Sequence, residues 1–348
     1  MIKVVLYGCG RIVEKHIQSL NKLKKKFKIT AICDTDKKKI ERYSKKLKVP
    51  GLLNIDDALK YGKPDLVSIL TPSGLHYDHA IKIIKKKINV VIEKPMCLKI
   101  TDGEKIQKLS NQKKTKVFVV MQNVFNRPVT KVLDDIKLNK FGKIFHASVV
   151  VKWRRDQKYY NQAKWRGTWK LDGGVVSNQA SHHIDLMRRI MGEPTEVYAI
   201  GKNYLSKIEC EDTALVIVKF KDGRTGMIEA TTAMRPKDIE GSISLMGTKG
   251  SAKIGGFALN QIDYYNLEKN ININKYKTNP KNVYGFGHVK FYDHVYHCVK
   301  TNVVSEFDAQ ESNKTVKFLN MIYRSIETGK KISSKYKINS IKLGKNIK

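Results

Sequence analysis

The chain has 348 residues, a length that predicts two domains with two packed cores. Its formal charge is +35, from 67 lysines and arginines against 32 aspartates and glutamates. Its longest apolar runs are too short to span a bilayer, and the five widely spaced cysteines form no Cys-x-x-Cys pair. These features argue against a membrane-spanning helix, a disulfide framework and a structural zinc site. We therefore expect a cytoplasmic protein without membrane insertion and without a metal.

The basic excess consists mostly of lysine, since only 11 of the 67 basic residues are arginines. Lysine runs such as residues 24–26, 37–39 and 85–87 fall on helix faces that we expect to be exposed. We interpret them as solvated surface and expect no specific nucleic-acid partner. An attraction to nucleic acid, an anionic membrane or a phosphorylated substrate stays open as the alternative.

The first third of the chain alternates strand and helix patterns. Val13, Ile17 and Leu20 repeat at helical spacing, and Asp36 is a plausible N-cap for a helix that begins at Lys37. The expected strands are short, apolar and often β-branched: Ile2–Leu6, Ile29–Cys33, Leu66–Leu70, Asn89–Ile92 and Lys116–Met121. This order predicts a doubly wound parallel sheet, a Rossmann domain, over residues 1–122.

The second region has a different pattern, which predicts an α/β domain with an open, mainly antiparallel sheet over residues 123–332. A helix near Val129–Ile136 comes first, and a second helix near Ser181–Met191 follows a long strand at about Ile144–Trp153. Further strands are expected at 195–202, 212–220, 225–232, 241–246 and 251–255, then helices at 288–302 and 309–328. Asp222-Gly223 is a hairpin-turn signal. Residues 333–348 are expected to form a poorly ordered basic tail.

Gly8-Cys9-Gly10 lies between the first strand and the first helix. The first glycine permits a tight turn, and the second lets a pyrophosphate approach the positive end of the helix. Val13 stands where the fingerprint usually has a third small residue, which weakens the match. Asp34 follows the second strand, where a ribose-binding carboxylate belongs, and its charge disfavours the extra phosphate of NADP. We therefore expect NAD.

Two further motifs follow expected strands at their carboxyl ends, where ligands bind in this fold. Thr71-Pro72-Ser73, with His76, follows one strand, and Glu93-Lys94-Pro95 follows another. By themselves the first could be an ordinary helix-entry loop and the second a surface turn.

Taken together, these segments resemble the Gfo/Idh/MocA family of oxidoreductases. The resemblance rests on Gly8–Ile12 with His16, Thr71–Ser73 with His76, Glu93–Pro95, Gln122-Asn123 and the segment from Gly173 to Asp185, and it extends to about residue 332. It implies a Rossmann domain followed by an α/β domain whose sheet often forms the oligomer contact, so we expect a homodimer or homotetramer. The cofactor residues expected from the turn and the resemblance are Gly8, Gly10, Arg11, Ile12, Asp34, Thr71, Pro72, His76, Glu93, Lys94 and Gln122.

One branch of the family is especially similar: enzymes that oxidise UDP-N-acetylglucosaminuronate at C3 in bacterial surface-polysaccharide synthesis. The similarity lies in Trp153–Gln157, Tyr159-Tyr160, Trp165–Trp169 and Asn178–His182. Arginine is scarce in this chain, so its recurrence in these segments suggests binding of an anionic substrate. The aromatic side chains among them could equally pack in a core. The substrate-binding residues expected are Lys94, Arg155, Tyr160, Trp165, Arg166, Asn178, Gln179, His182, Asp185 and Arg235.

The resemblance places His182 and Lys94 at the family's catalytic positions. His182 would take the proton of the reacting hydroxyl, Lys94 would stabilise the oxygen's negative charge, and Asp185 would orient His182 or a substrate hydroxyl. Asn178 departs from the wider family, in which aspartate is common, and leaves proton removal to His182.

Three alternatives remain. The chain could be an inositol or free-sugar dehydrogenase, or a non-catalytic NAD sensor or polyanion-binding protein. The family also contains NAD-using glycosidases, which have a Gly-His motif near the active site. The most similar segment here is Tyr284–His288, and its position late in the chain argues against an equivalent motif.

Overall fold

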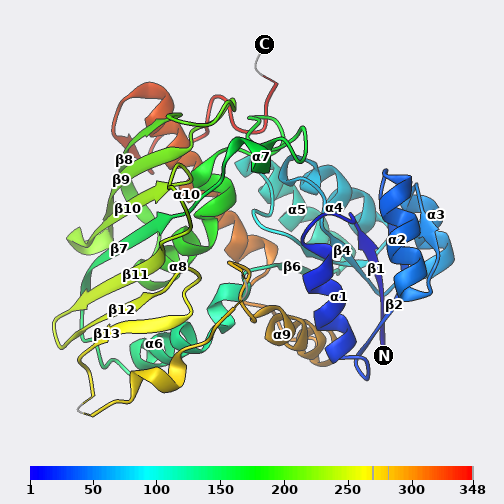
Figure 1. Cartoon of the computed structure of the whole chain (residues 1–348), viewed down its shortest axis with the longest axis horizontal. Coiled ribbons are helices and arrows are strands. Elements are labelled where there is room, and N and C mark those ends of the chain that lie inside the picture. Colours follow the sequence, from blue (N-terminus) through cyan, green and yellow to red (C-terminus); the bar gives the residue numbers. More distant parts are fainter. Residues whose placement is uncertain (269, 281, 347–348) are drawn as a thin grey trace. The chain divides into compact units, whose positions relative to one another are not determined.

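The computed structural model describes residues 1–268, 270–280 and 282–346, which form two compact units (Figure 1). The first unit comprises Met1–Cys97, Thr101–Met121 and His288–Asn313. The second comprises Leu98–Ile100, Gln122–Gly287 and Lys314–Lys348. No helix among the described residues is both long and apolar enough to cross a lipid bilayer.

The first unit contains a six-stranded parallel sheet in the order β3-β2-β1-β4-β5-β6. The helices that connect these strands, and α9, follow the helical patterns in the sequence. The side chain of Asp36 caps α2 by accepting the amides of Lys38 and Lys39. The strands are β1 (Ile2–Tyr7), β2 (Phe27–Cys33), β3 (Gly51–Leu52), β4 (Leu66–Ile69), β5 (Asn89–Ile92) and β6 (Val117–Val119). The helices are α1 (Val13–Lys22), α2 (Lys37–Leu47), α3 (Ile55–Gly62), α4 (His76–Lys85), α5 (Ile100–Lys113) and α9 (His288–Thr301). The expected Rossmann sheet is confirmed.

The second unit contains an eight-stranded sheet in the order β13-β12-β11-β7-β10-β9-β8-β14. Its pairs are antiparallel except for β7 and β10, so the mainly antiparallel sheet is also confirmed. The strands are β7 (Ile144–Lys152), β8 (Pro194–Lys202), β9 (Thr213–Phe220), β10 (Thr225–Thr231), β11 (Glu240–Gly247), β12 (Ser251–Gly255), β13 (Gln261–Tyr265) and β14 (Ile332–Ser333). The helices are α6 (Arg127–Lys137), α7 (Gln157–Tyr160), α8 (Ser181–Met191) and α10 (Ala309–Thr328), whose first residues belong to the first unit.

Strand β9 shows how the second sheet uses its two faces. Ala214, Val216 and Val218 point into the core, while the alternate Leu215 and Ile217 are 54% and 64% exposed. The turn to β10 is the expected one, because Asp222 and Gly223 both adopt positive φ angles, as a tight primed hairpin turn requires.

The expected domain boundaries need one correction. The second domain was expected to continue unbroken to residue 332, but His288–Asn313 belongs to the first unit. Within that unit α9 packs beside α1 (Figure 1). Helical periodicity shows which face of α9 is apolar, but not which sheet that face covers.

The expectation of a poorly ordered tail was wrong for residues 340–343. The carboxylate of Glu327 accepts hydrogen bonds from the amides of Ile341 and Lys342, and Ser340 donates its amide to Asn320. Leu343 is 2% exposed and is part of the core of the second unit. The high lysine content suggested solvation, but the burial of Leu343 and the hydrogen bonds of the neighbouring amides attach this segment to the second unit.

Candidate functional site

The glycine turn of the first unit has the shape that a dinucleotide needs. Gly8 has a φ of +106°, and a Cβ there would stand 2.7 Å from the backbone of Leu70, so the position requires glycine. A Cβ on Gly10 would meet open space, and α1 begins at Val13 without a side-chain cap on its first amides. Open space in front of uncapped helix amides fits a diphosphate. Ile12 precedes the helix, and Arg11 is exposed.

Asp34 supports this turn and still has capacity for a ligand. One carboxylate oxygen accepts the amide of Cys9 at 2.6 Å, and the other accepts the amide of Asp36 at 2.9 Å. A carboxylate can accept about four hydrogen bonds, so lone pairs remain for ribose hydroxyls. The residues present therefore fit the adenosine half of NAD.

The Thr71 and Glu93 motifs are held together by His76, which is 1% exposed. Its ring nitrogens lie 2.8 Å from the carbonyl oxygens of Thr71 and Pro95. Burial lowers the pKa of His76, and the two carbonyls oppose that effect. His76 therefore positions the two motifs from beneath, which differs from the direct cofactor contact expected of it. Pro72 is partly exposed between these anchors.

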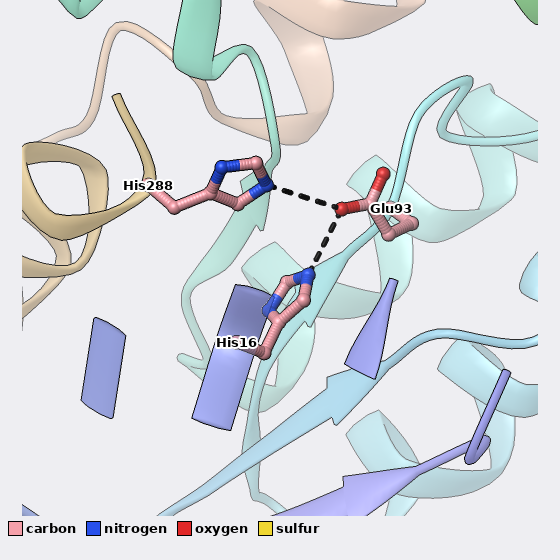
Figure 2. Close-up of side chains that lie close together, drawn as sticks. All are labelled: His16, Glu93 and His288. Atoms are coloured by element: carbon pink, nitrogen blue, oxygen red, sulfur yellow. Dashed lines mark hydrogen bonds and ion pairs between the residues drawn. The ribbon is translucent and has the colours of Figure 1, made fainter. Parts of the chain in front are cut away.

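Glu93 points into the interior of the first unit, between His16 and His288 (Figure 2). Its Oε1 lies 2.9 Å from Nε2 of His16 and 4.0 Å from Nε2 of His288. Nδ1 of His16 lies 2.6 Å from the hydroxyl of Tyr292, which in turn contacts Ser68 at 2.8 Å. The Glu93 side chain thus anchors the turn that carries Lys94, rather than facing a cofactor as expected.

The electrostatics of this triad favour a charged carboxylate. Burial alone would raise the pKa of Glu93, but the hydrogen bond with His16 and the electrostatic influence of His16 and Lys94 lower it to about 2. Burial and the neighbouring His16 lower the pKa of His288 to about 3. The carboxylate is therefore charged and His288 neutral at neutral pH.

The same three residues form a group whose ligand atoms lie within 4.8 Å of one another, as a metal site requires. However, ligands 2.0–2.1 Å from a tetrahedral zinc stand roughly 3.3 Å apart, whereas His16 and Glu93 are at the 2.9 Å of a hydrogen bond. We therefore interpret the triad as a buried hydrogen-bonded cluster. No sequence pattern linked His288 to this cluster, because it lies far from the other two residues along the chain.

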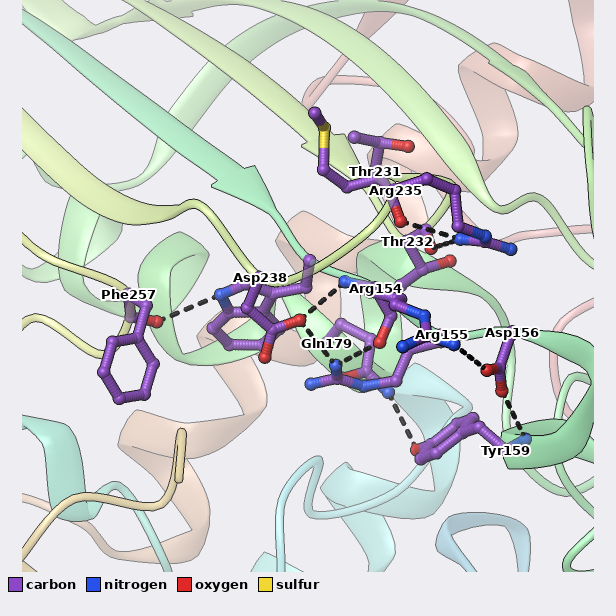
Figure 3. A network of polar contacts seen from close by, with 12 residues as sticks. Arg154, Arg155, Asp156, Tyr159, Gln179, Thr231, Thr232, Arg235, Asp238 and Phe257 are labelled. Atoms are coloured by element: carbon purple, nitrogen blue, oxygen red, sulfur yellow. Dashed lines mark hydrogen bonds and ion pairs between the residues drawn. The ribbon is translucent and has the colours of Figure 1, made fainter. Parts of the chain in front are cut away.

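In the second unit, the arginines expected to bind substrate have different surroundings (Figure 3). Arg155 pairs with Asp238 at 3.0 Å and lies over the rings of Trp153 and Tyr159. Its charge is already balanced, so we no longer assign it to an anionic substrate. Arg235 is exposed and donates to the carbonyl oxygen of Met234.

Arg166 differs from Arg155 in having no acidic partner among the described residues. Its guanidinium lies 4.4 Å from the ring centre of Tyr159 and 4.7 Å from that of Trp165, and it donates to the Tyr159 hydroxyl at 2.5 Å. Its Nε atom is buried and unbonded within the described part of the chain. An arginine stacked between two rings, with an unused donor, is suited to bind a carboxylate or diphosphate.

Two expected substrate residues have structural roles instead. Tyr160 is buried, and its hydroxyl lies 3.0 Å from that of Thr232. Asp185 is 1% exposed and accepts from Arg189 at 2.7 Å and from Thr315 at 2.5 Å. It also pairs with Arg188. The helical spacing of Asp185 from His182 suggested a shared polar face, but the carboxylate turns into the core to neutralise two arginines.

Asn178 and Gln179 lie on a short π-helix, Val175–Gln179, that leads into α8 and His182. The Asn178 amide donates to Asp172, and the Gln179 amide donates to Tyr159 and to Asn178 at 3.1 Å. Asp172, which the sequence analysis missed, also accepts the amide of Gly167. A π-helical turn often marks a functional site because it re-aims side chains at a cost in backbone hydrogen bonding.

Glu211 supports the π-helix from below. Its Oε1 accepts from the amide of Val176 and from the Tyr323 hydroxyl at 3.0 Å, and that hydroxyl accepts the amides of Gly174 and Ser177. Burial raises the pKa of Glu211 to about 7. Sequence patterns give no sign of this residue, since its role depends on contact with a distant turn.

The comparisons with known proteins agree with this geometry. Residues 2–121 match the model of an oxidoreductase family with an NAD-binding Rossmann fold, GFO_IDH_MocA, and residues 129–253 match the GFO/IDH/MocA C-terminal domain. The structure resembles that of the WlbA dehydrogenase from Bordetella pertussis, solved with NADH and UDP-GlcNAcA. The TM-score is 0.91 at 34% identity, over 95% of this chain and 97% of the other.

Two curated relatives are more distant. Myo-inositol 2-dehydrogenase from Thermotoga maritima is 24% identical over 72% of this chain and 74% of its own length. The Bacillus subtilis protein YteT is 25% identical, over 50% of this chain and 42% of its own length.

Asp34 should determine the choice between NAD and NADP. The Asp34 carboxylate would repel the extra phosphate of NADP, since two unit charges 4 Å apart repel by about 4 kcal/mol at an effective dielectric of 20. We expect Asp34→Asn to keep an acceptor for the turn but to lower the ratio of kcat/KM for NAD over NADP at least about tenfold. Asp36→Asn, at the neighbouring helix cap, should leave the ratio unchanged; an unchanged ratio in Asp34→Asn would contradict the assignment.

Glu211 should make the stability of the fold depend on pH. Its folded pKa is raised above the ordinary 4.5, so its stabilising contribution is complete below 4.5 and is lost as the pH rises to about 7. This shift corresponds to about 3 kcal/mol. In urea unfolding, Glu211→Gln should gain stability relative to wild type as the pH is raised through this window.

The control is Glu41→Gln on the exposed face of α2, for which the difference from wild type should stay flat with pH. A flat difference for Glu211→Gln as well would show that this carboxyl titrates normally in the folded protein.

Proposed function

Because this chain belongs to the Gfo/Idh/MocA oxidoreductases, an NAD-binding family, we propose that it oxidises a hydroxyl of an anionic nucleotide sugar to a keto group. A UDP-N-acetylhexosaminuronate used in surface-polysaccharide synthesis is the proposed substrate. The observation that carries this proposal is Arg166, stacked between Tyr159 and Trp165 with a buried donor unused. The ligand UDP-GlcNAcA in the similar WlbA structure supports the same class.

The reaction divides between cofactor and protein. When bound, NAD accepts the hydride from the carbon that is oxidised. We assign removal of the hydroxyl proton to His182 and stabilisation of the resulting negative oxygen to Lys94, at the positions that the family resemblance gives them. Asn178 lacks a basic lone pair and is held by Asp172, so it supplies hydrogen bonds and takes no proton.

A free-polyol dehydrogenase is the second candidate, favoured by the similarity to myo-inositol 2-dehydrogenase. Membership of an oxidoreductase family disfavours the third reading, a non-catalytic NAD sensor. We also propose that the enzyme acts in the cytoplasm, and the absence of disulfides among its five buried cysteines, all in the described part of the chain, supports this.

A substrate panel tests the proposal. The purified protein is incubated with NAD and UDP-N-acetylglucosaminuronate, UDP-N-acetylglucosamine or myo-inositol, and NADH formation is followed. An oxo-acid acceptor is included in parallel, so that turnover with a tightly held cofactor is detected. We expect clear preference for the uronate, because only it presents a carboxylate to Arg166. Preference for myo-inositol would overturn the proposal in favour of the second candidate.

Arg166→Met should raise KM for the uronate by about 10- to 100-fold, the range for a lost charge-assisted hydrogen bond. Arg154→Met, which removes an exposed arginine from the same segment, is the matched control and should change KM little.

His182→Ala and Lys94→Ala should each lower kcat at least about a hundredfold, the lower end of the range for acid-base groups. His297→Ala, on the exposed face of α9, controls for loss of a histidine. Near-normal turnover in either site variant would show that the chemistry is carried by other groups.

We further propose that the enzyme is a homodimer or homotetramer built on the outer face of the second sheet. Ile217 lies opposite Tyr198 on one neighbouring strand and Met227 on the other, and all three are at least 40% exposed. Leu215 and Ile200 extend this apolar row. A contiguous apolar face of this kind marks a protein interface, and closed homo-oligomers are its commonest use.

Light scattering after gel filtration tests this interface. Ile217→Lys should shift the protein to a smaller species, because it would bury an unpaired charge in the contact. Leu138→Lys, at an exposed position after α6, should leave the assembly intact. An unchanged mass for Ile217→Lys would place the contact elsewhere.

A further inference from the structure

Gln122 stands at the start of the short 3₁₀ helix Gln122–Phe125 and contacts His182. Its side-chain nitrogen lies 3.2 Å from Nε2 of His182, and its side chain is 2% exposed. The backbone of Gln122 is held by close packing, since a Cβ on Gly287 would stand 1.9 Å from the Gln122 carbonyl oxygen. The amide is therefore presented to the imidazole from a fixed position.

The amide of Gln122 also has a second contact. The same side-chain nitrogen lies 3.4 Å from Oδ1 of Asn123, an acceptor. In the structure the Gln122 nitrogen faces both partners, and we take the amide in this orientation. An amide nitrogen carries two hydrogens, one for each contact. With the amide in this orientation Nε2 of His182 is the acceptor, which corresponds to a neutral ring with its single proton on Nδ1.

This tautomer matters for the reaction. A neutral imidazole has one lone pair, and only the nitrogen that bears it can take a proton. The Gln122 contact keeps that lone pair on Nε2. This hydrogen bond can form only when Nε2 of His182 carries no hydrogen, because an N–H on Nε2 would point at the N–H of the Gln122 amide. It therefore favours the basic form of His182 over the imidazolium.

We propose that Gln122 is a positioning residue that fixes the tautomer of His182 and makes Nε2 the atom that accepts the substrate proton. This inference rests on the proposed function through the role of His182. It assigns to Gln122 a task different from the cofactor contact expected from the sequence. The resting enzyme would thus hold its base in the form that the reaction requires before substrate arrives.

Two substitutions separate this role from a merely structural one. Gln122→Leu removes the donor, so the acidic limb of the pH profile of kcat/KM should move up by roughly 0.5–1 pH unit, the equivalent of one neutral hydrogen bond. Gln122→Glu places a negative charge beside the ring, so the limb should move up by more than about 1 unit. Gln107→Glu on α5 adds the same charge outside the site and should leave the profile unchanged.

A second readout does not depend on turnover. In ¹⁵N-histidine NMR without substrate, the His182 resonances, identified by their loss in His182→Ala, should show the proton on Nδ1 in wild type. Gln122→Leu should shift the population toward the Nε2-protonated form. NAD binding is measured on each variant by calorimetry.

The outcomes distinguish the inference from the proposed function. If neither the His182 resonances nor the acidic limb of the pH profile moves in the Gln122 variants, the proposed role of Gln122 is overturned. If these variants only bind NAD more weakly, Gln122 contacts the cofactor, as the sequence predicted. The expected tautomer in a protein that oxidises no member of the sugar panel would support the role of Gln122 at the ring while overturning the proposed function.

Discussion

The buried carboxylate of Glu93 is the interaction on which the first unit depends. It joins His16 of α1 to the turn that carries Lys94, and it faces His288 at the start of α9. A buried charge is tolerated only when it is paired, and the low pKa of about 2 shows that the pairing outweighs the burial. Because the glycine turn precedes α1, the contact between His16 and Glu93 also connects that turn to the segment of Lys94. Lys94 is the residue proposed to stabilise the reacting oxygen.

The second unit, in the part of the chain that the structure describes, contains both paired and unpaired arginines. Arg155 is paired with Asp238, and Asp185 with two arginines, so these charged groups stabilise the fold. Arg166 is stacked on aromatic rings and has no acidic partner among the described residues. A cation placed without its counter-ion is costly unless a ligand supplies the missing charge. This contrast, rather than the number of arginines, supports the proposal of an anionic substrate.

A buried acid below the π-helix completes this arrangement. Glu211 and Tyr323 together satisfy three amides of the segment from Gly174 to Ser177, which leads to Asn178 and Gln179. The side chains proposed to bind the substrate are therefore positioned by groups that the substrate need not contact. Such support is typical of sites whose geometry must be fixed before the ligand binds.

Local patterns in the sequence were enough for the elements and for residues whose role is local. The strand and helix order, the cap at Asp36, the turn at Asp222-Gly223 and the glycine turn at Gly8 all follow from periodicity, turn chemistry and backbone freedom. The family resemblance added His182 and Lys94 as catalytic positions, which remain predictions. Sequence patterns also indicated arginines near aromatic residues, but could not tell Arg155 from Arg166.

Only the tertiary structure decided what those side chains contact. It turned Asp185 into the core, placed α9 in the first unit and brought His288 to Glu93. It also set Gln122 against His182, a pair separated by 60 positions in the chain. Periodicity reports which face of an element is buried, whereas the partner on that face is fixed by packing between segments far apart in sequence. The sequence thus determined the fold class and the cofactor, and packing determined which charged groups remain for the substrate.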